Sequence, residues 1–254
     1  MSLGRAQAVG TGGDWGDGVL ARLTTARLTA RGFLTNASNH TLLVQVGDPG
    51  DGVHAVYKPR AGERPLWDFP SGTLCQRETA AYLVSAFLGW GVVPPTVLRD
   101  GPMGPGSVQL FVPHDPRRHY FVLVDDETHH RELARIATFD LLINNADRKA
   151  SHVMLGDDGR IRGCDHGLTF HPQPKLRTVI WELAGTPLAP EWRADLARLD
   201  AAVDSPAHEL TRALRQLLSS REVAALRRRA ARLCTAQALP VVDGPLRAYP
   251  WPPL

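Results

Sequence analysis

Lysine is scarce in this chain. The 29 basic residues comprise 26 arginines and only three lysines, which are Lys58, Lys149 and Lys175. The lysine ammonium is a compact point charge, and the planar fork of arginine does not replace it at a point contact to phosphate. The retained lysines are therefore candidates for functional contacts to phosphate oxygens.

Cysteines and long apolar runs are also few. Three cysteines without regular spacing exclude a disulfide framework and a cysteine-rich zinc module. The N-terminus has no charged segment followed by an apolar run, and no apolar stretch is long enough to span a bilayer. These absences predict a soluble cytoplasmic protein. The net charge of +3 over 254 residues is modest, so we expect no DNA binding.

The pattern along the chain predicts an α+β fold with two lobes around a cleft. Residues 1–25 are glycine-rich and are predicted to be a disordered leader, followed by a β-rich N-lobe over 26–112 and a helical C-lobe over 113–254. In the N-lobe we expect a three-stranded antiparallel meander, one helix and two further strands. The ranges are Arg27–Leu34, His40–Val46 and Val53–Lys58 for the meander, a helix capped by Thr73 and Gln76 that ends near Leu88, then strands Val92–Leu98 and Ser107–Val112.

The C-lobe is predicted to begin with a helix over His129–Ile143. Two short strands should follow at His152–Leu155 and Ile161–Cys164. The remainder has helical periodicity, with N-caps expected at Ser205 and Ser220. A two-lobed chain with a cleft is a natural shape for nucleotide binding.

Lys58 closes the third expected strand and can point into that cleft. There it would meet α- and β-phosphate oxygens, held by a carboxylate for which Glu78 on the following helix is the candidate. Glu78 lies off the apolar stripe of its helix, a position equally typical of a solvent-facing residue. The alternative is a surface lysine at a strand end.

A second segment carries two aspartates in an order that fits phosphoryl transfer. The helix ends in a polar loop bearing Asp147, a hairpin returns the chain, and Asp165 follows an apolar strand just before Gly167. One carboxylate would accept the proton of an acceptor hydroxyl while the other holds a metal that bridges the phosphates. The residue five positions after Asp147, His152, would be a ligand of the same metal. The alternative is a surface loop followed by a β-turn.

The segment from Asp147 to Gly167 resembles the catalytic and metal-binding loops of phosphatidylinositol 3-/4-kinase-like atypical kinases and, more loosely, of the HipA toxin kinases. Asp147 and Arg148 match the start of an Asp-Arg-x-x-x-Asn loop, Asp165 lies 18 residues later, and Asn145 resembles the HipA version. Four segments across roughly residues 27–238 resemble an uncharacterised actinobacterial family that is itself similar to those kinases. They are Tyr57–Pro59, Arg64–Pro70, Val93–Thr96 and Asp165–Phe170.

The chain departs from those kinases at three points. His152 replaces an asparagine, and imidazole is a poorer ligand for Mg²⁺ than for Mn²⁺ or Zn²⁺. His166 replaces the phenylalanine of the Asp-Phe-Gly element. A Gly-x-Gly-x-x-Gly loop is also missing, so the first hairpin turn would cover the phosphates through Ser38, Asn39 and backbone amides.

These residues predict an ATP-dependent phosphotransferase that uses Mg²⁺ or Mn²⁺. Asp147 would act on the acceptor hydroxyl with Asn145 beside it, and Lys149 would steady the γ-phosphate. Gln109, Phe111 and Val112 would form the hinge that contacts adenine. The acceptor, a protein or a small molecule, stays open. A pseudokinase that binds nucleotide without turnover and an AMP transferase on the same fold are the alternatives.

Three other groups of residues are considered. A hydrolytic metal site could be formed by a histidine-rich set: His152, Asp165, His166 and His171. Trp67 and Phe69 are predicted to be packing residues of their proline-rich loop. The arginines of Arg221–Arg232 predict a basic helix face, which is either solvated or bound to an acidic partner or nucleic acid.

Overall fold

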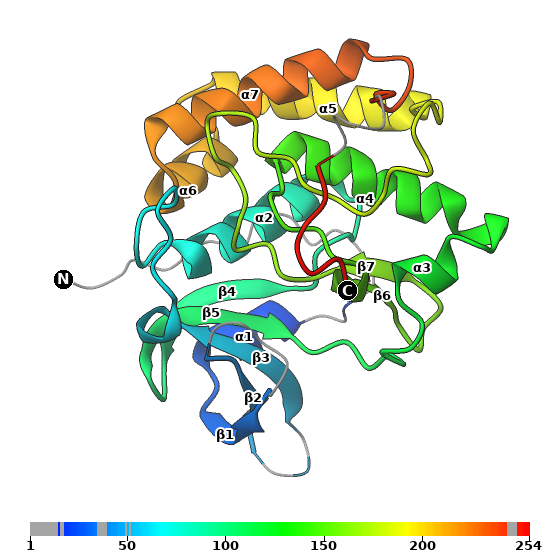
Figure 1. Ribbon diagram of the computed structural model, residues 1–254. Coiled ribbons are helices and arrows are strands. Elements are labelled where there is room, and N and C mark those ends of the chain that lie inside the picture. Colours follow the sequence, from blue (N-terminus) through cyan, green and yellow to red (C-terminus); the bar gives the residue numbers. More distant parts are fainter. Residues whose placement is uncertain (1–14, 16–17, 35–39, 49, 51, 243–247) are drawn as a thin grey trace.

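The computed structural model describes residues 15, 18–34, 40–48, 50, 52–242 and 248–254 (Figure 1). Its N-lobe is a five-stranded antiparallel sheet with the order β1-β2-β3-β5-β4. The strands are β1 (Leu28–Phe33), β2 (Leu42–Val46), β3 (Val53–Pro59), β4 (Thr96–Gly101) and β5 (Gly104–Leu110). The predicted meander β1-β2-β3 is confirmed, with β3 paired to β5 on its other side.

The fourth strand begins later than the sequence predicts, and the fifth strand begins earlier. β4 starts at Thr96 because Pro94 and Pro95 have no N–H to donate to a ladder. Val92 instead accepts a hydrogen bond from the Gly163 amide (2.8 Å), which belongs to the C-lobe. β5 ends at Leu110, so Val112 lies in the connection between the lobes.

The prediction of a disordered leader over residues 1–25 is wrong for its last seven residues, which form helix α1 (Val19–Thr25). Its side chain Leu23 is fully buried with Val44 and Val108 in the core of the N-lobe. The C-terminal carbonyls of the helix are satisfied by Arg99, which donates to the carbonyl oxygens of Leu23 and Ala26. One buried leucine and one arginine cap therefore give order to this short segment.

Helix α2 (Leu74–Leu88) lies between the sheet and the helices of the C-lobe (Figure 1). Because it is covered on several sides, Glu78 is buried although it lies off the apolar stripe. The expected cap is absent: the Thr73 hydroxyl donates to the Pro70 carbonyl instead. Glu63 takes its place, since its carboxylate accepts a hydrogen bond from the Cys75 amide (2.9 Å).

The C-lobe is mostly helical, as predicted. Helix α4 (His130–Ile143) leads into a two-stranded sheet of β6 (Val153–Leu155) and β7 (Ile161–Gly163). The remaining helices are α3 (Tyr120–Leu123), α5 (Pro190–Asp204), α6 (Glu209–Leu217) and α7 (Ser220–Thr235). The caps of the last two helices are corrected to His208 and Ser219, each of which accepts an amide hydrogen bond from its helix.

The main hydrophobic core joins the lobes. It includes α2 residues such as Val84 together with residues of α4, α5, α6 and α7. The last residues of the chain pack beside the candidate catalytic loop, where the Pro253 carbonyl accepts a hydrogen bond from Ala150 (Figure 1). None of the helices in the described part of the chain is both long and apolar enough to cross a lipid bilayer.

Candidate active site

Lys58 lies at the junction of the two lobes and contacts two carboxylates. Its ammonium donates to Glu78 Oε1 and to Asp165 Oδ1, the latter at 2.8 Å. Burial alone would lower the pKa of Lys58, but Asp165 and Glu78 outweigh it and hold that pKa above its ordinary value. One ammonium therefore serves two carboxyl groups contributed by different lobes.

Each of the three side chains is directed by its element. Tyr57 on β3 faces the core of the N-lobe, so its neighbour Lys58 projects from the opposite face of the sheet, toward α2. Glu78 on α2 is fixed from the other side because its Oε2 accepts a hydrogen bond from the His166 amide (2.9 Å). Asp165 follows β7 with φ of 55°, a left-handed conformation that aspartate tolerates better than most residues.

Asp165 keeps one oxygen available. Burial alone would raise the pKa of its carboxyl group, but Lys58 outweighs it, and the pKa lies well below its usual range. Oδ1 contacts Lys58, whereas Oδ2 lies 3.4 Å from Nε2 of His152, and half of the side chain is exposed. An ionised carboxylate thus faces the space between the lobes.

His152 directs an unprotonated nitrogen at that carboxylate. Its Nδ1 lies 3.0 Å from the Asp147 carbonyl oxygen, which can only accept, while the Lys149 amide is farther away at 3.5 Å. Burial lowers the pKa of His152 to about 4, so the ring is neutral, with its proton on Nδ1. The lone pair of Nε2 and the Asp165 carboxylate then face each other with no proton between them.

That arrangement fits a divalent cation. An imidazole nitrogen and a carboxylate oxygen are both metal ligands, and a cation between them would remove their repulsion. Within the described residues, no group of three or more His, Cys, Asp or Glu side chains could hold a metal ion. Phosphate oxygens and water would have to complete the coordination, as they usually do for Mg²⁺.

Asp147 lies in the loop after α4. Burial raises the pKa of its carboxyl group to about 6, and the ammonium of Lys149, 3.7 Å from Oδ2, acts against that rise. The Asp147 amide donates to Asn145 Oδ1 (3.0 Å). Asn145 is fully buried and its Nδ2 donates to Asp140, so it holds the loop from within rather than facing the cleft.

Arg148 and Asp140 form a buried ion pair that the sequence analysis did not identify. Nε and Nη2 of Arg148 donate to the two Asp140 oxygens, each at 2.8 Å. Nη1 donates to the carbonyl oxygens of His152 and Cys164, and Nη2 also donates to Nε2 of His166. The pair therefore joins α4, the Asp147 loop and the Asp165 segment. The available signal was a charged residue, Asp140, inside an apolar helical pattern.

His166 replaces the expected phenylalanine and is fully buried. Its Nε2 accepts from Arg148, so the ring is neutral with the proton on Nδ1, which has no hydrogen-bond partner among the described residues. Burial holds the pKa of His166 well below its usual value. The ring also lies edge-on to Phe139 on α4, with centroids 5.9 Å apart. A polar anchor to Arg148 thus takes the place of an apolar one.

Other predicted site residues lie elsewhere. Ser38 and Asn39 fall outside the described residues. Gln109 is buried in the sheet, where its side-chain amide donates to Thr96, while Phe111 and Val112 lie in the connection between the lobes. The hydrolytic metal hypothesis is wrong, because His166 is bonded to Arg148 and His171 packs against Phe69 instead of joining Asp165.

The proline-rich loop confirms one packing prediction and corrects the other. Phe69 is buried, and the guanidinium of Arg77 lies over its ring. Trp67 is 89% exposed, and the ammonium of Lys175 lies over its ring, 4.6 Å from the centroid. Lys175 also pairs with Asp68 (2.9 Å), so it lies outside the Lys58 cluster.

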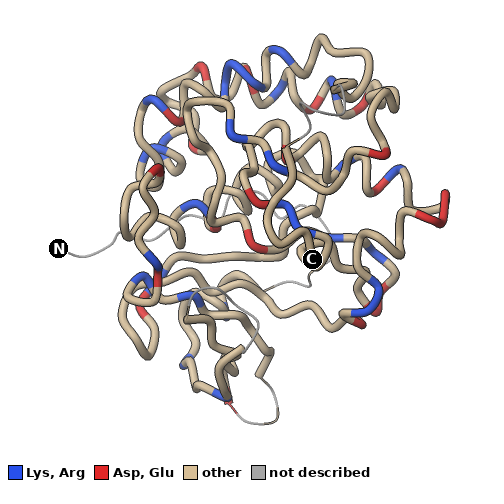
Figure 2. The backbone as a smooth tube through the Cα atoms, viewed as in Figure 1, with Lys and Arg blue, Asp and Glu red and all other residues tan. Residues whose placement is uncertain are grey.

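The arginines of α7 do not form one uniform face. Figure 2 shows Lys and Arg along this helix at the top of the molecule. Arg227 turns toward α5, where it pairs with Asp200 and Asp204. Arg228, Arg229 and Arg232 line a cavity instead.

The antiparallel sheet with one inserted helix and the mostly helical second lobe define a two-lobed α+β protein, as predicted, in which Lys58 contacts carboxylates of both lobes. No family model matches the chain. It is 41% identical over 265 residues to Protein Rv2133c of Mycobacterium tuberculosis, covering 91% of this chain and 94% of that protein. The chain therefore belongs to the family of this mycobacterial protein.

One solved structure with a similar arrangement is a proinflammatory kinase, CtkA, of Helicobacter pylori. The TM-score is 0.45 at 11% sequence identity, over 83% of this chain and 98% of that chain.

Proposed function

We propose that the protein is an ATP-dependent phosphotransferase of the atypical-kinase kind that works in the cytoplasm. The observation that carries the proposal is the contact of Lys58 with Glu78 and Asp165, made between the lobes beside the Asp147 loop. A lysine held by a helix glutamate next to an aspartate that can bind a metal is the arrangement by which protein kinases carry out phosphoryl transfer.

Lys58 would bind the α- and β-phosphates of ATP. An incoming phosphate oxygen would replace Asp165 Oδ1 as its second partner, while Glu78 keeps the ammonium in place. The adenine would be recognised by the backbone between the lobes. In the described part of the chain, the Val112 N–H and the Phe111 carbonyl take part in no hydrogen bond, whereas the Phe111 N–H already donates to His54. Coverage of the phosphates by Ser38 and Asn39 stays a prediction.

Asp165 and His152 would hold the divalent cation, Mg²⁺ or Mn²⁺. When bound, the cation would neutralise charge on the phosphates. The imidazole donor favours Mn²⁺ over Mg²⁺ relative to a site with only oxygen ligands.

Asp147 would accept the proton of the acceptor hydroxyl. A general base works best when its pKa lies near the working pH, and burial has raised the pKa of Asp147 to about 6. Lys149 beside it would contact the transferred phosphoryl group, and Asn145 would act as a positioning residue through the Asp147 amide. The acceptor would be a protein or a small molecule that carries a hydroxyl group.

A pseudokinase is the second candidate, favoured by one observation. His152 is held by the Asp147 carbonyl and lies against Asp165 where the similar kinases carry asparagine. A protein that only senses nucleotide needs the Lys58 contacts but not the Asp147 carboxylate. Transfer of AMP on the same fold is the third possibility.

The test separates nucleotide binding from turnover. We expect calorimetry with ATP to give saturable binding in Mn²⁺ or Mg²⁺ that Asp165→Asn removes. Asp147→Asn should leave ATP binding within about twofold and abolish phosphoryl transfer, by on the order of 10²-fold or more. The matched control is Asp157→Asn, which removes one exposed carboxylate from the β6-β7 turn.

Three results would change the conclusion. Failure to bind ATP with either cation would overturn the nucleotide site. Saturable binding without autophosphorylation or ATP hydrolysis, insensitive to Asp147→Asn, would establish the pseudokinase. Mass spectrometry of the modified product would show whether a phosphoryl or an adenylyl group is transferred.

A further inference from the structure

The C-lobe contains a cavity of about 510 Å³ that is separate from the Lys58 site. Its walls come from the end of α4, the segment over residues 172–181, helix α7 and the chain near Pro240. The wall formed by α7 carries three arginines, several other lining side chains are apolar, and no aspartate or glutamate is among the described residues that line the cavity. A volume of this size is within the range of pockets that bind small molecules, ~300–1,000 Å³.

Arg229 is the most informative residue of the basic wall. Its Nε donates to the Leu142 carbonyl (2.7 Å) and its Nη1 approaches the His171 carbonyl (3.4 Å). Its Nη2 is buried and has no hydrogen-bond partner among the described residues. Burial and the neighbouring Arg228 lower the pKa of Arg229 to about 10, a value at which the guanidinium is still charged at neutral pH. A buried cation with an unused donor is costly unless something pairs with it.

Arg229 has no counter-charge among the residues that the structure describes. Across the described ranges, no carboxylate forms an ion pair with Arg228, Arg229 or Arg232. The adjacent Arg227 shows that α7 pairs its arginines where carboxylates are near, since it contacts Asp200 and Asp204. Arg228 and Arg232 alone would fit an ordinary solvated face, but the buried Nη2 of Arg229 does not.

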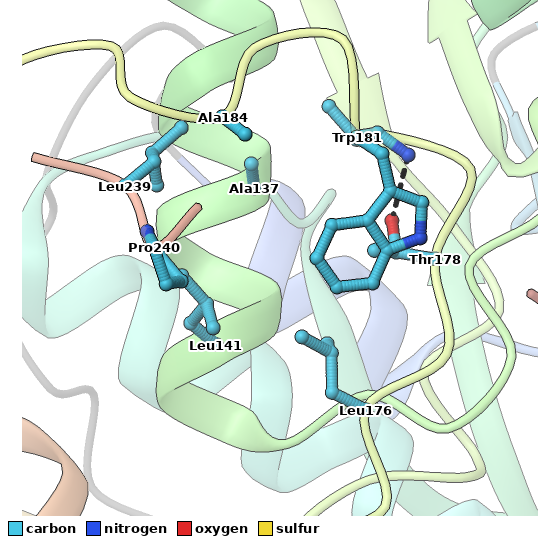
Figure 3. A pocket seen from close by; sticks show the side chains of 9 residues that line it. Ala137, Leu141, Leu176, Thr178, Trp181, Ala184, Leu239 and Pro240 are labelled. Atoms are coloured by element: carbon cyan, nitrogen blue, oxygen red, sulfur yellow. Dashed lines mark hydrogen bonds between the residues drawn. The ribbon is translucent and has the colours of Figure 1, made fainter. Parts of the chain in front are cut away.

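The apolar wall is formed by Leu141, Leu176 and Trp181. The same three side chains also line a smaller cavity of about 20 Å³, and Figure 3 shows them there with Ala137 and Leu239. These apolar side chains therefore connect the larger cavity with the packed interior around the smaller one. An apolar group of a small ligand could therefore be buried against these side chains.

We infer that this cavity binds a small organic anion, in which one phosphate or carboxylate group lies against the α7 arginines and an apolar body lies against Trp181 and Leu176. Arginine forks match both kinds of oxyanion geometrically. Arg228 and Arg232 are exposed, whereas Arg229 is partly buried, and all three line the cavity. This site does not rest on the proposed phosphotransfer, and its test needs no ATP.

The experiment uses the full chain and the fluorescent probe 8-anilinonaphthalene-1-sulfonate, an aromatic anion, with phenyl phosphate, benzoate and inorganic phosphate as competitors. We expect one probe site per chain, displaced by phenyl phosphate or benzoate at a concentration at least about tenfold lower than by inorganic phosphate, because inorganic phosphate has no apolar body. The competitor with the lower dissociation constant identifies the head group.

Two variants locate the site. The double substitution Arg228→Gln with Arg232→Gln should weaken probe binding at least about tenfold, since both residues line the cavity and are exposed. Leu176→Asp, which places a carboxylate in the cavity, should abolish it. The matched control is Arg221→Gln, which removes the same charge from the same helix outside the cavity.

The inference is overturned if the double variant binds the probe as tightly as the unmodified protein, or if Arg221→Gln weakens binding equally. It is also overturned if inorganic phosphate competes as well as phenyl phosphate does, because the apolar wall would then play no part. Circular dichroism of each variant shows that lost binding is not lost folding.

Discussion

The Arg148–Asp140 pair and the Lys58–Asp165 pair both belong to the candidate active site, yet their side chains differ widely in solvent exposure. The side chains of Arg148 and Asp140 are 0% and 1% exposed, whereas those of Lys58 and Asp165 are 23% and 50% exposed. All five N–H donors of Arg148 are used within the protein. Asp165 retains an oxygen that faces only a neutral imidazole.

This difference separates a framework from a binding site. A buried guanidinium whose donors are all satisfied has no capacity left for a ligand, so its role is to fix the loops that carry Asp147 and Asp165. The side chains of Lys58 and Asp165 are charged and partly exposed, so they can exchange their contacts with each other for contacts with a ligand. Breaking each pair in turn should therefore affect different properties.

The largest effect is expected from Asp140→Ala. It would leave Arg148 charged and buried without its carboxylate, which typically costs about 3–5 kcal/mol of stability. We expect the free energy of unfolding, measured by urea denaturation, to fall by that amount. The control is Asp125→Ala, at an exposed position before α4, where a change within about 0.5 kcal/mol is expected. Equal stability of the two variants would show that the Arg148 cluster is not a framework.

The two pairs also differ in how far the sequence reveals them. Lys58 stands out because lysine is scarce, and Asp165 stands out because it follows a strand and precedes a glycine. Both are local signals. The side chain of Arg148 instead turns back to Asp140 on the preceding helix, and the polar pattern of the loop does not indicate that direction. The one signal in the sequence was Asp140, a charged residue at a position of α4 where the helical pattern is otherwise apolar.

Contacts between segments that are far apart in the sequence could not be predicted for a further reason. Arg77 on α2 donates to Glu222 on α7 (2.5 Å), and to the Thr169 carbonyl (2.6 Å). The partners Arg77 and Glu222 are 145 residues apart, and each has an ordinary local interpretation, as a helix surface residue or a helix cap. Only the burial of α2 between the lobes makes them neighbours. The same burial explains why Glu78 was harder to place than Lys58.

The Arg77–Glu222 pair is intermediate in this comparison, because it is buried and yet titratable. Burial alone would raise the pKa of Glu222, but Arg77 and the Ser219 cap outweigh it, and the pKa is lowered. A carboxyl group whose pKa is lower in the folded than in the unfolded chain stabilises the fold at pH values above its unfolded pKa, about 4.3 for glutamate. That stabilisation is lost as the pH falls through the folded pKa. We expect Glu222→Gln to lower the free energy of unfolding by about 1–2 kcal/mol at pH 7.

The pH dependence supplies the control for that prediction. The gap between Glu222→Gln and the unmodified protein should narrow as the pH falls below about 4.3 toward the lower folded pKa, because Glu222 then gains a proton and loses the charge that the variant also lacks. Urea denaturation between pH 3 and pH 7 measures it. Glu209→Gln, at an exposed position in the first turn of α6, should show no comparable gap. A gap that stays constant with pH would mean that the carboxylate charge is not what holds α2 to α7.

The smallest change in stability is expected at the open pair. Asp165→Asn removes a half-exposed charge, and exposed ion pairs contribute about 0–1 kcal/mol. Asparagine also tolerates the left-handed backbone at this position, where φ is 55°. The free energy of unfolding should therefore stay within about 1 kcal/mol of the unmodified protein, although the same substitution is expected to remove ATP binding. If Asp165→Asn destabilised the protein as much as Asp140→Ala, both pairs would belong to the framework, and the distinction drawn from their exposure would fail.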